Sequence, residues 1–422
     1  MGLHKTLGFF SLTMYGVGII VGAGIYALIG EASGMAGYGV WLSFLLGAII
    51  AAFTALSYAE LSSAFTECSA EANYVGMASG KNWLGFLVGW LVVAVGFVAA
   101  AVVSLGFAGY FATIFPLPML IIAIALIIIL SMVDLIGIDV SAKINIAFTI
   151  VSLIGIIIVI ALGIPYLGSA DYFALDNGFN GVLGATALIF FAYLGFEAIV
   201  KLGEETRHAK KIMPKALLAS IAISSVLYVL LALSAVSILS PEQLGATKAP
   251  LAEVAAAAGT PELGMLLTII ALFAMVTTVL VSLIVTSRLL YGLAEKHELP
   301  LIFLRTSKKT GAPYIAVFVT MIAAILMCFF SEIAIIAKAT TFMVFVTFLA
   351  VNVSLIMLRR KKNYRPEFRV PLNIKNFPVI AFFGAISSAF MLTRYSYFEW
   401  AIAVVFVIIG IAVYKIEKTR IK

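Results

Sequence analysis

The chain is poor in charge, cysteine and histidine, and these shortages exclude several classes of protein. Asp, Glu, Lys and Arg make up 11% of its 422 residues, against about 25% in soluble domains. Hydrophobic residues reach 63%, which excludes a soluble globular protein. Cys68 and Cys328 form no C-x-x-C pair, and none of the three histidines is spaced as a ligand pair. The sequence therefore predicts neither a disulfide framework nor a metal site.

Enzymatic signatures are also missing. No nucleophile–base pair, phosphate loop or metal-ligand cluster stands out, so we expect no enzyme, no cofactor and no nucleotide-driven pump. Gly22-Ala-Gly-Ile-Tyr-Ala27 matches G-x-G-x-x-A, but no βαβ unit surrounds it and the ribose-binding acid is absent. We expect no cleavable signal either, because the apolar run behind the polar residues 1–6 has full spanning length and no small-residue cleavage site.

What the sequence does contain is a series of apolar runs long enough to cross a bilayer core of about 30 Å. Twelve are predicted: 9–30, 38–65, 83–112, 117–137, 142–165, 181–203, 214–239, 262–292, 313–330, 332–357, 376–393 and 398–415. An even number of spans places both termini on one side of a multi-pass membrane protein.

The basic residues set the orientation. Of the 27 lysines and arginines, only Lys248, Lys338 and Arg394 fall on the side away from the termini, and the rest, Lys201 among them, fall on the side of the termini. The positive-inside rule therefore predicts that both termini lie in the cytoplasm. Arg359-Arg-Lys-Lys362 is interpreted as a flank against anionic lipid headgroups and not as a nucleic-acid site. Nothing in the sequence sets the oligomeric state.

Two spans contain helix-weakening glycines. Gly16, Gly18, Gly22 and Gly24 stand in the first, and each costs about 1 kcal/mol relative to alanine in a helix interior. The sixth span contains Gly195, followed by Glu197. Transporters place substrate at broken helices near the membrane midplane, so we interpret Gly22 to Gly24 as the floor of a binding site. The alternative is helix packing, since Gly18 and Gly22 also form G-x-x-x-G.

Three sets of polar side chains lie at membrane depth. We expect Glu60 to be a neutral, hydrogen-bonded structural carboxyl, or one close enough to the cytoplasmic surface to be wetted. Glu197 has this interpretation and a functional one, which the sequence does not separate. Ala274, Thr277 and Thr278 share one helical face. The two hydroxyls suit either a sodium ion or hydrogen bonds to their own helix, and the second is the more common arrangement.

Several motifs, in this order, make the chain resemble the amino acid-polyamine-organocation superfamily of transporters, closest to its prokaryotic and cationic-type amino acid transporters. The resemblance runs nearly end to end. It is carried by Gly16-x-Gly18, Gly22-Ala-Gly24-Ile25, Tyr58-Ala-Glu-Leu61, Phe190-Phe-Ala-Tyr-Leu-Gly-Phe-Glu197, Glu204-Glu-Thr206, Met213-Pro214, Ser287-Arg288, Leu299-Pro300, Ala312-Pro-Tyr314 and Arg365-Pro-Glu-Phe-Arg-Val-Pro371.

The resemblance implies an all-α membrane fold of the LeuT type with about twelve helices. Helices 1–5 (residues 1–165) and helices 6–10 (residues 166–357) would form two inverted repeats, with helices 1 and 6 broken, and residues 358–422 would add two helices. A twelve-helix major-facilitator fold is less consistent with the sequence, because its halves are parallel six-helix repeats.

The resemblance also implies a site in which backbone groups bind the parts common to all amino acids. The substrate carboxylate would meet the amides of Ala23, Gly24 and Ile25, at the positive end of a half-helix. The α-amino group would meet carbonyls freed near Phe190, Ala192 and Tyr193, and Phe196 would close over the substrate as a gate. The remaining residues expected to line the site are Ile20, Gly22 and Gly195.

The chain departs from the family pattern in two places. Proton-coupled members often carry a lysine in the fifth span where this chain has Ser152, and Lys143 does not replace it. This departure argues against proton coupling through that lysine. It favours either uncoupled exchange or a sodium ion bound near Ile19, Ala274, Thr277 and Thr278. If the transporter is proton-coupled, Glu197 is the alternative proton carrier. The second departure is the loop Thr66-Glu-Cys-Ser-Ala-Glu-Ala-Asn73, where the family has a proline and paired glycines.

The predicted function is secondary active transport of amino acids by alternating access. The third span contains no acid between Leu91 and Phe111, and an unpaired buried cation costs several kcal/mol. We therefore expect neutral, apolar substrates. The alternatives are a cationic amino acid or polyamine, if Glu197 faces the cavity, and a channel or sensor built on the same fold.

Overall fold

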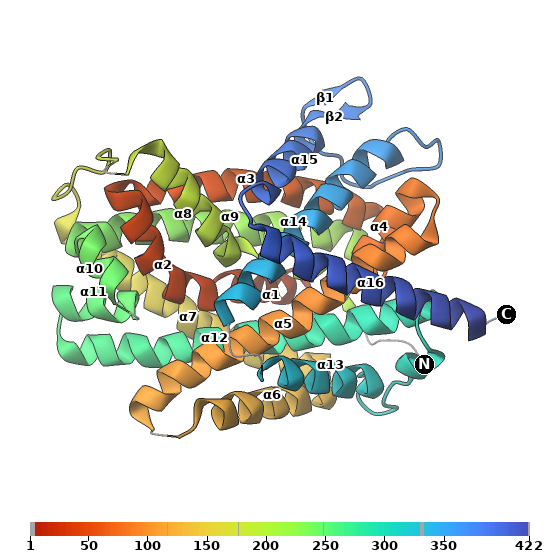
Figure 1. The fold of residues 1–422 in the computed structure, drawn as a ribbon, viewed down its shortest axis with the longest axis horizontal. Coiled ribbons are helices and arrows are strands. Elements are labelled where there is room, and N and C mark those ends of the chain that lie inside the picture. The colour runs from red at the N-terminus through yellow and green to blue at the C-terminus, as the bar shows by residue number, and fades with distance from the viewer. Residues whose placement is uncertain (1–4, 116, 176, 248, 330–332, 421–422) are drawn as a thin grey trace.

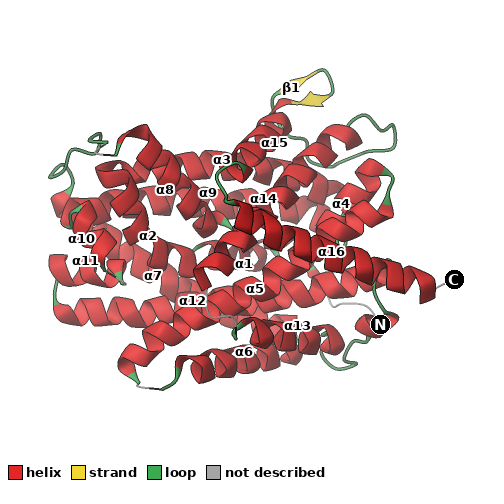
Figure 2. Ribbon diagram, viewed as in Figure 1, coloured by secondary structure: helices red, strands yellow, loops and turns green. Residues whose placement is uncertain are grey.

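The computed structural model describes residues 5–115, 117–175, 177–247, 249–329 and 333–420. Helices make up most of this part of the chain, and the sheet in it is one antiparallel hairpin, β1 (Asn373–Ile374) and β2 (Phe377–Pro378) (Figure 2). Lys248, predicted on the side away from the termini, and residues 330 and 332, which bound two predicted spans, lie outside the described residues.

The elements alternate long apolar helices with short connecting ones. Up to residue 166 they are α1 (Phe9–Ile20), α2 (Ala23–Ala36), η1 (Gly37–Gly39), α3 (Val40–Ala64), α4 (Ala70–Ser79), α5 (Asn82–Ile114), α6 (Met119–Ile136), α7 (Ile138–Gly163) and η2 (Ile164–Tyr166). After it they are α8 (Gly178–Tyr193), η3 (Phe196–Glu205), α9 (Ala209–Ile238), α10 (Pro241–Ala246), α11 (Pro250–Ala258), α12 (Pro261–Glu295), η4 (Leu301–Leu304), α13 (Tyr314–Met327), α14 (Ile333–Leu358), α15 (Val379–Leu392) and α16 (Tyr397–Arg420).

Each predicted span coincides with one helix or with two half-helices. Within the described residues, ten segments are long and apolar enough to cross a membrane. The other two, α13 and α15, have 14 residues each, or about 21 Å at 1.5 Å per residue, and fall short of a ~30 Å core. The first span ends as α1 and α2, and the sixth as α8 and η3.

Most long helices run along one axis of the molecule, so the bundle has two ends (Figure 1). We call the end with α4 and the last turns of α16 the terminal face. The end with α10 and α11 is the far face (Figure 1). The half-helix α1 lies inside the bundle, in contact with α7, α9, α12 and η3, while α2 packs on α8. The two interrupted spans therefore meet in the middle of the protein.

Candidate functional site

The first span breaks between Ile20 and Ala23. α1 ends at Ile20, Val21 is its C-cap, Gly22 has φ −99° and ψ −147°, and α2 starts at Ala23. The N–H groups in the first turn of a helix have no acceptor within that helix, and they carry its positive dipole end. The N–H of Ala23 lies 3.4 Å from the Thr278 hydroxyl.

The sixth span breaks at Leu194 and Gly195. Leu194 is extended with ψ 145°, and Gly195 has φ +116°, a left-handed conformation that glycine adopts without a steric penalty. The Gly195 N–H donates to Glu197 Oε2 at 2.8 Å. The last carbonyls of α8 form the negative end of its dipole.

The two breaks touch each other. A Cβ added to Gly24 would lie 2.7 Å from the Cα of Ala192, and one added to Gly195 would lie 2.6 Å from the Ile19 side chain. At Gly24 the close approach is therefore made against backbone, which cannot move aside as a flexible side chain can. The structure thus brings the start of α2 and the end of α8 together, so opposite dipole ends adjoin at one point.

The hydroxyl of Tyr228, in α9, contacts backbone carbonyls at both breaks. Its hydroxyl lies within hydrogen-bonding distance of the Ile20 carbonyl and 3.1 Å from the Ala192 carbonyl, and its side chain is fully buried. The Ala192 carbonyl, expected to bind the substrate amino group, therefore already has one hydrogen-bonding neighbour. Sequence reasoning missed Tyr228, because nothing in the seventh span marks that residue.

Two cavities lie at the breaks and share part of their lining. The far cavity, about 1430 Å³, extends from Gly24 to the far face between Glu31, Tyr110, Asn180 and Arg394. The central cavity, about 80 Å³, continues toward the terminal face. Its lining includes Ile19, Ile20, Gly24, Val95, Ala99, Gly195, Glu197, Lys201 and Thr278. Gly24, Val103 and Phe191 line both cavities.

The aromatic residues of the sixth span do not all lie where the sequence predicted. Phe196, expected as a gate, is fully buried and packs on Tyr58 and Phe348, with centroids 5.9 and 5.3 Å apart. Tyr193 is also buried, and its hydroxyl donates to the Phe44 carbonyl. The aromatic side chain that lines both cavities is Phe191. Phe196 therefore lines neither cavity, because the turn at Gly195 places its side chain in the core, and its role as a gate stays a prediction.

The predicted sodium ligands lie together beside the first break. The Thr277 hydroxyl donates to the Ala274 carbonyl at 2.7 Å or the Gly18 carbonyl at 3.1 Å, and the Thr278 hydroxyl to Ala274 at 3.2 Å. This is the helix back-bonding that the sequence favoured. Ser152 lines neither cavity. Its hydroxyl donates to the Phe148 carbonyl, and its own carbonyl accepts from Tyr26.

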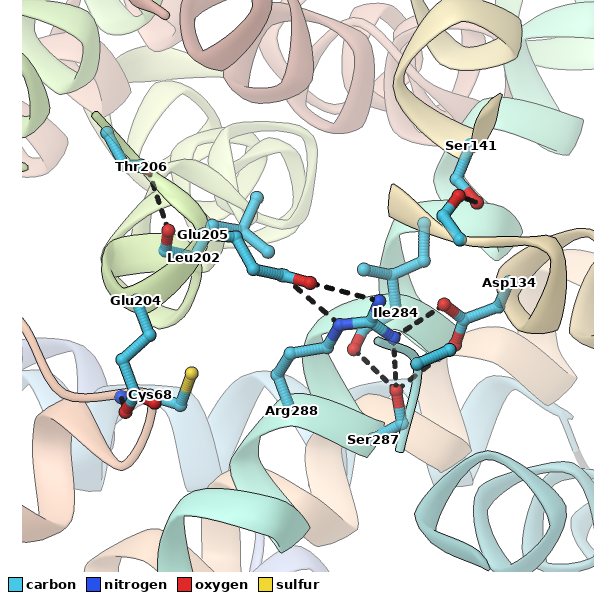
Figure 3. Close-up of polar contacts among 12 residues, drawn as sticks. Cys68, Asp134, Ser141, Leu202, Glu204, Glu205, Thr206, Ile284, Ser287 and Arg288 are labelled. Atoms are coloured by element: carbon cyan, nitrogen blue, oxygen red, sulfur yellow. Dashed lines mark hydrogen bonds and ion pairs between the residues drawn. The ribbon is translucent and has the colours of Figure 1, made fainter. Parts of the chain in front are cut away.

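Buried ion pairs tie the terminal ends of the spans together. The Arg288 guanidinium lies between two carboxylates, with NH1 2.5 Å from Asp134 and Nε 3.3 Å from Glu205 (Figure 3). Asp134 is at the end of α6 and Glu205 at the end of η3, so Arg288 of α12 joins three elements. Next to it, the N–H groups of Thr6 and Leu7 donate to the Glu205 carbonyl, which fastens the segment before α1.

Glu60 is a structural carboxyl, but it is ion-paired and not the neutral, hydrogen-bonded group that the sequence predicted. Its two oxygens accept from the Arg359 guanidinium at 2.6 and 2.5 Å, and one also accepts from the Val370 N–H. Arg359 is buried, so the first residue of the basic tract Arg359-Arg-Lys-Lys362 is not a headgroup contact.

The loop that departs from the family pattern contributes one partner, Glu71, to another buried ion pair. After Ser69, residues 70–79 form α4, and Glu71 in its first turn lies 2.7 Å from the ammonium of Lys201. Lys201 belongs to η3 and is buried, although its sequence position placed it among the basic residues of the terminal side. Neither partner was singled out from the sequence, since they are 130 positions apart.

Membrane-length apolar helices around a cavity at two broken spans are the architecture of a membrane transporter. A family model described as "Amino acid permease" matches residues 7–415. The chain therefore belongs to the amino acid permease family, of the amino acid-polyamine-organocation superfamily, and is a multi-pass membrane protein that transports amino acids.

Its curated relatives include transporters of several substrates. The branched-chain amino acid permease BcaP of Bacillus subtilis is 26% identical over 98% of this chain and 92% of its own length. A BcaP of Lactococcus lactis is 26% identical over 94% of this chain and 91% of its own. Cationic amino acid transporter 9 of Arabidopsis thaliana is 31% identical over 72% of this chain and 57% of its own.

Proposed function

We propose that this protein is a secondary active transporter of neutral, branched aliphatic amino acids that works by alternating access. The observation that carries the proposal is the meeting of two opposite helix ends at a cavity. The start of α2 supplies positive N–H groups and the end of α8 supplies negative carbonyls. A zwitterion matches this pair of charges with its carboxylate and its ammonium group.

In the proposed complex the substrate carboxylate accepts from the N–H groups of Gly24 and Ile25, and Ala23 borders it beside Thr278. The ammonium group faces the carbonyls near Phe190 and Ala192, which lie at the end of α8. Backbone groups thus bind the carboxylate and ammonium groups that all amino acids share, and the walls of the central cavity contact the substrate side chain. Phe191, which lines both cavities, would separate the substrate from the far face.

The walls of the central cavity favour an aliphatic side chain. Val92, Val95, Ala99 and Val103 of α5 line one side of it, with Val285 of α12 and Ile20 of α1. When an aliphatic substrate side chain packs against these walls, the binding free energy becomes more favourable by about 25 cal/mol for each Å² of apolar surface removed from water. The two BcaP relatives, named as branched-chain permeases, support this choice of substrate.

The proposed orientation places the terminal face in the cytoplasm, on the basis of the excess of lysine and arginine on that side. The far cavity then opens outward, while the Arg288 cluster and the paired segments at Leu7 and Thr206 close the inner side. Alternating access would require these inner contacts to part. The proposed repeats, residues 1–165 and 166–357, are the units that would move, with residues 358–422 packed against them.

The test is counterflow in proteoliposomes that contain unlabelled leucine. We expect labelled leucine, isoleucine and valine to enter and to compete with one another, whereas lysine in tenfold excess does not compete. Current without counterflow would identify a channel, and binding without flux would identify a sensor. Either result would contradict the proposal.

A cationic amino acid is the second candidate, because one acid lines the central cavity. Glu197 belongs to that lining, and Cationic amino acid transporter 9 is a relative. Competition by lysine stronger than that by leucine would favour this candidate. The engagement of the Glu197 carboxylate with the Gly195 N–H makes it the weaker of the two.

A further inference from the structure

Glu71, Lys201 and Glu197 form a cluster with two carboxyl groups and one ammonium group. The Lys201 Nζ lies 2.7 Å from Glu71 Oε1 and 3.0 Å from the Glu197 backbone carbonyl. The side chains of Lys201 and Glu71 are 3% and 0% exposed. Among the lysines whose side chains the structure describes, only Lys201 is buried.

The groups around this cluster are mostly uncharged. From α3, the Tyr58 hydroxyl donates to Glu71 Oε1 at 3.3 Å, and from α4 the Tyr74 ring packs edge-on against Tyr58. The next acid along the loop, Glu67, is held by the Asn73 amide. Glu71 Oε2 has no hydrogen-bond partner among the described residues. No second cation from these elements compensates the second carboxyl.

The charges in the cluster therefore do not balance when both carboxyls are ionised. One ammonium neutralises one carboxylate. Lys201 and Glu71 are buried and Glu197 is half-buried, so a second carboxylate without a cation is unfavourable at this place. A proton on one of the carboxyl groups removes that unfavourable charge. Arg288 also faces two acids, but its guanidinium contacts both carboxylates directly, and no member of that cluster lines the central or the far cavity. The Lys201 ammonium, by contrast, reaches only the backbone of Glu197.

The cluster is connected to the substrate path. Glu197 and Lys201 line the central cavity, which shares Gly24, Val103 and Phe191 with the far cavity. Glu197 also accepts from the N–H of Gly195, the residue at which the sixth span breaks. A proton arriving with substrate can thus reach Glu197, and its binding changes the charge at the break.

We propose that Glu71, Lys201 and Glu197 are the proton-binding site that couples this transporter to the proton gradient, in the place of the absent lysine at Ser152. In the outward-open state the Glu197 carboxyl holds the proton and Lys201 pairs with Glu71. When the inner side opens, the O–H bond of Glu197 breaks, the proton passes to cytoplasmic water, and Lys201 is shared by two carboxylates until the next proton arrives. The inference rests on the proposed function.

The charge count makes the variants distinguishable. Glu197→Gln leaves Glu71 balanced by Lys201, and Glu71→Gln leaves Glu197 balanced by Lys201, so neither cluster needs a proton. The double variant Glu71→Gln with Lys201→Met leaves the half-buried Glu197 without a cation, which again favours a proton on it. A purely structural role for the Glu71–Lys201 pair would not restore coupling in the double variant.

The experiment uses purified full-length protein in proteoliposomes with the membrane potential clamped, labelled leucine outside and a trapped pH dye inside. A gradient of one pH unit supports at most about tenfold accumulation if one proton moves with each leucine. We expect the native protein and the double variant to accumulate leucine several-fold and to acidify the interior. Glu197→Gln and Glu71→Gln should retain counterflow but equilibrate leucine at about onefold.

The control is Glu253→Gln, which changes an exposed acid of α11 away from both cavities and should match the native protein. Native-like accumulation of leucine by Glu197→Gln or Glu71→Gln would overturn the proposed proton site. Accumulation of leucine by the native protein under a sodium gradient alone would also overturn it. Absence of amino acid counterflow in the native protein would instead overturn the proposed function. Counterflow in each variant shows that it has folded.

Discussion

Arg288 and Glu205 form a buried ion pair that fixes the terminal end of the sixth span to α12. The Arg288 Nε and NH2 atoms each lie 3.3 Å from a different oxygen of Glu205, an arrangement in which the planar guanidinium fork matches the carboxylate. Because η3 is the continuation of the broken span, this pair sets where the terminal half of that span lies. It also closes the side of the protein opposite the far cavity.

Loss of this pair should destabilise the protein. Arg288→Met leaves the carboxylates of Asp134 and Glu205 buried without a cation, and breaking a buried pair in this way costs about 3–5 kcal/mol. We expect a fall of several degrees in the Tm measured in detergent. Arg369→Met, at an exposed position, is the matched control and should leave the Tm within a degree of the native value. An unchanged Tm in Arg288→Met would contradict the structural role.

Tyr228→Phe should impair transport while the protein remains folded. The substitution removes one hydroxyl that serves the Ile20 and Ala192 carbonyls, and leaving such groups unsatisfied costs about 1–3 kcal/mol. We expect the leucine KM in counterflow to rise by roughly tenfold or more. Tyr397→Phe changes a side chain that is 96% exposed and should have no effect. A native KM in Tyr228→Phe would show that the hydroxyl does not organise the site.

Gly24→Ala should abolish uptake. The added methyl would lie 2.7 Å from the Cα of Ala192, so α2 and α8 would have to separate at the point where they are proposed to bind substrate. The control is Gly34→Ala in the same helix, where the nearest atom to the new Cβ is 3.7 Å away. Both variants are measured for membrane insertion and for leucine uptake. Normal uptake by Gly24→Ala would remove the site from this break.

Ala99→Leu should change the substrate preference. Ala99 lines the central cavity among aliphatic side chains, and the larger residue occupies space that the proposed model assigns to the substrate side chain. We expect the ratio of leucine to alanine uptake to fall by about tenfold, which corresponds to ~1.4 kcal/mol. The ratio is informative because it is insensitive to expression level. A constant ratio would place the side-chain pocket elsewhere.

The sequence alone determined the class of protein and the positions of the helix breaks. Both follow from local properties. Runs of apolar residues specify membrane spans wherever they occur, and the glycines at 22, 24 and 195 weaken a helix whatever surrounds it. Glu60 was predicted as a neutral, hydrogen-bonded structural carboxyl or a wetted one, whereas the structure pairs it with Arg359, a partner that the sequence could not identify.

Only the tertiary structure decided which side chains face the cavities and which groups pair. Phe191 and Phe196 are both aromatic residues near one glycine, but Phe191, in α8, lines both cavities, whereas Phe196, after the turn at Gly195, lies in the core. Lys201 resembles any basic residue near the end of a span until the fold brings Glu71 to it across 130 positions. Such pairings depend on helix packing between distant segments, and one sequence contains no local signal for them.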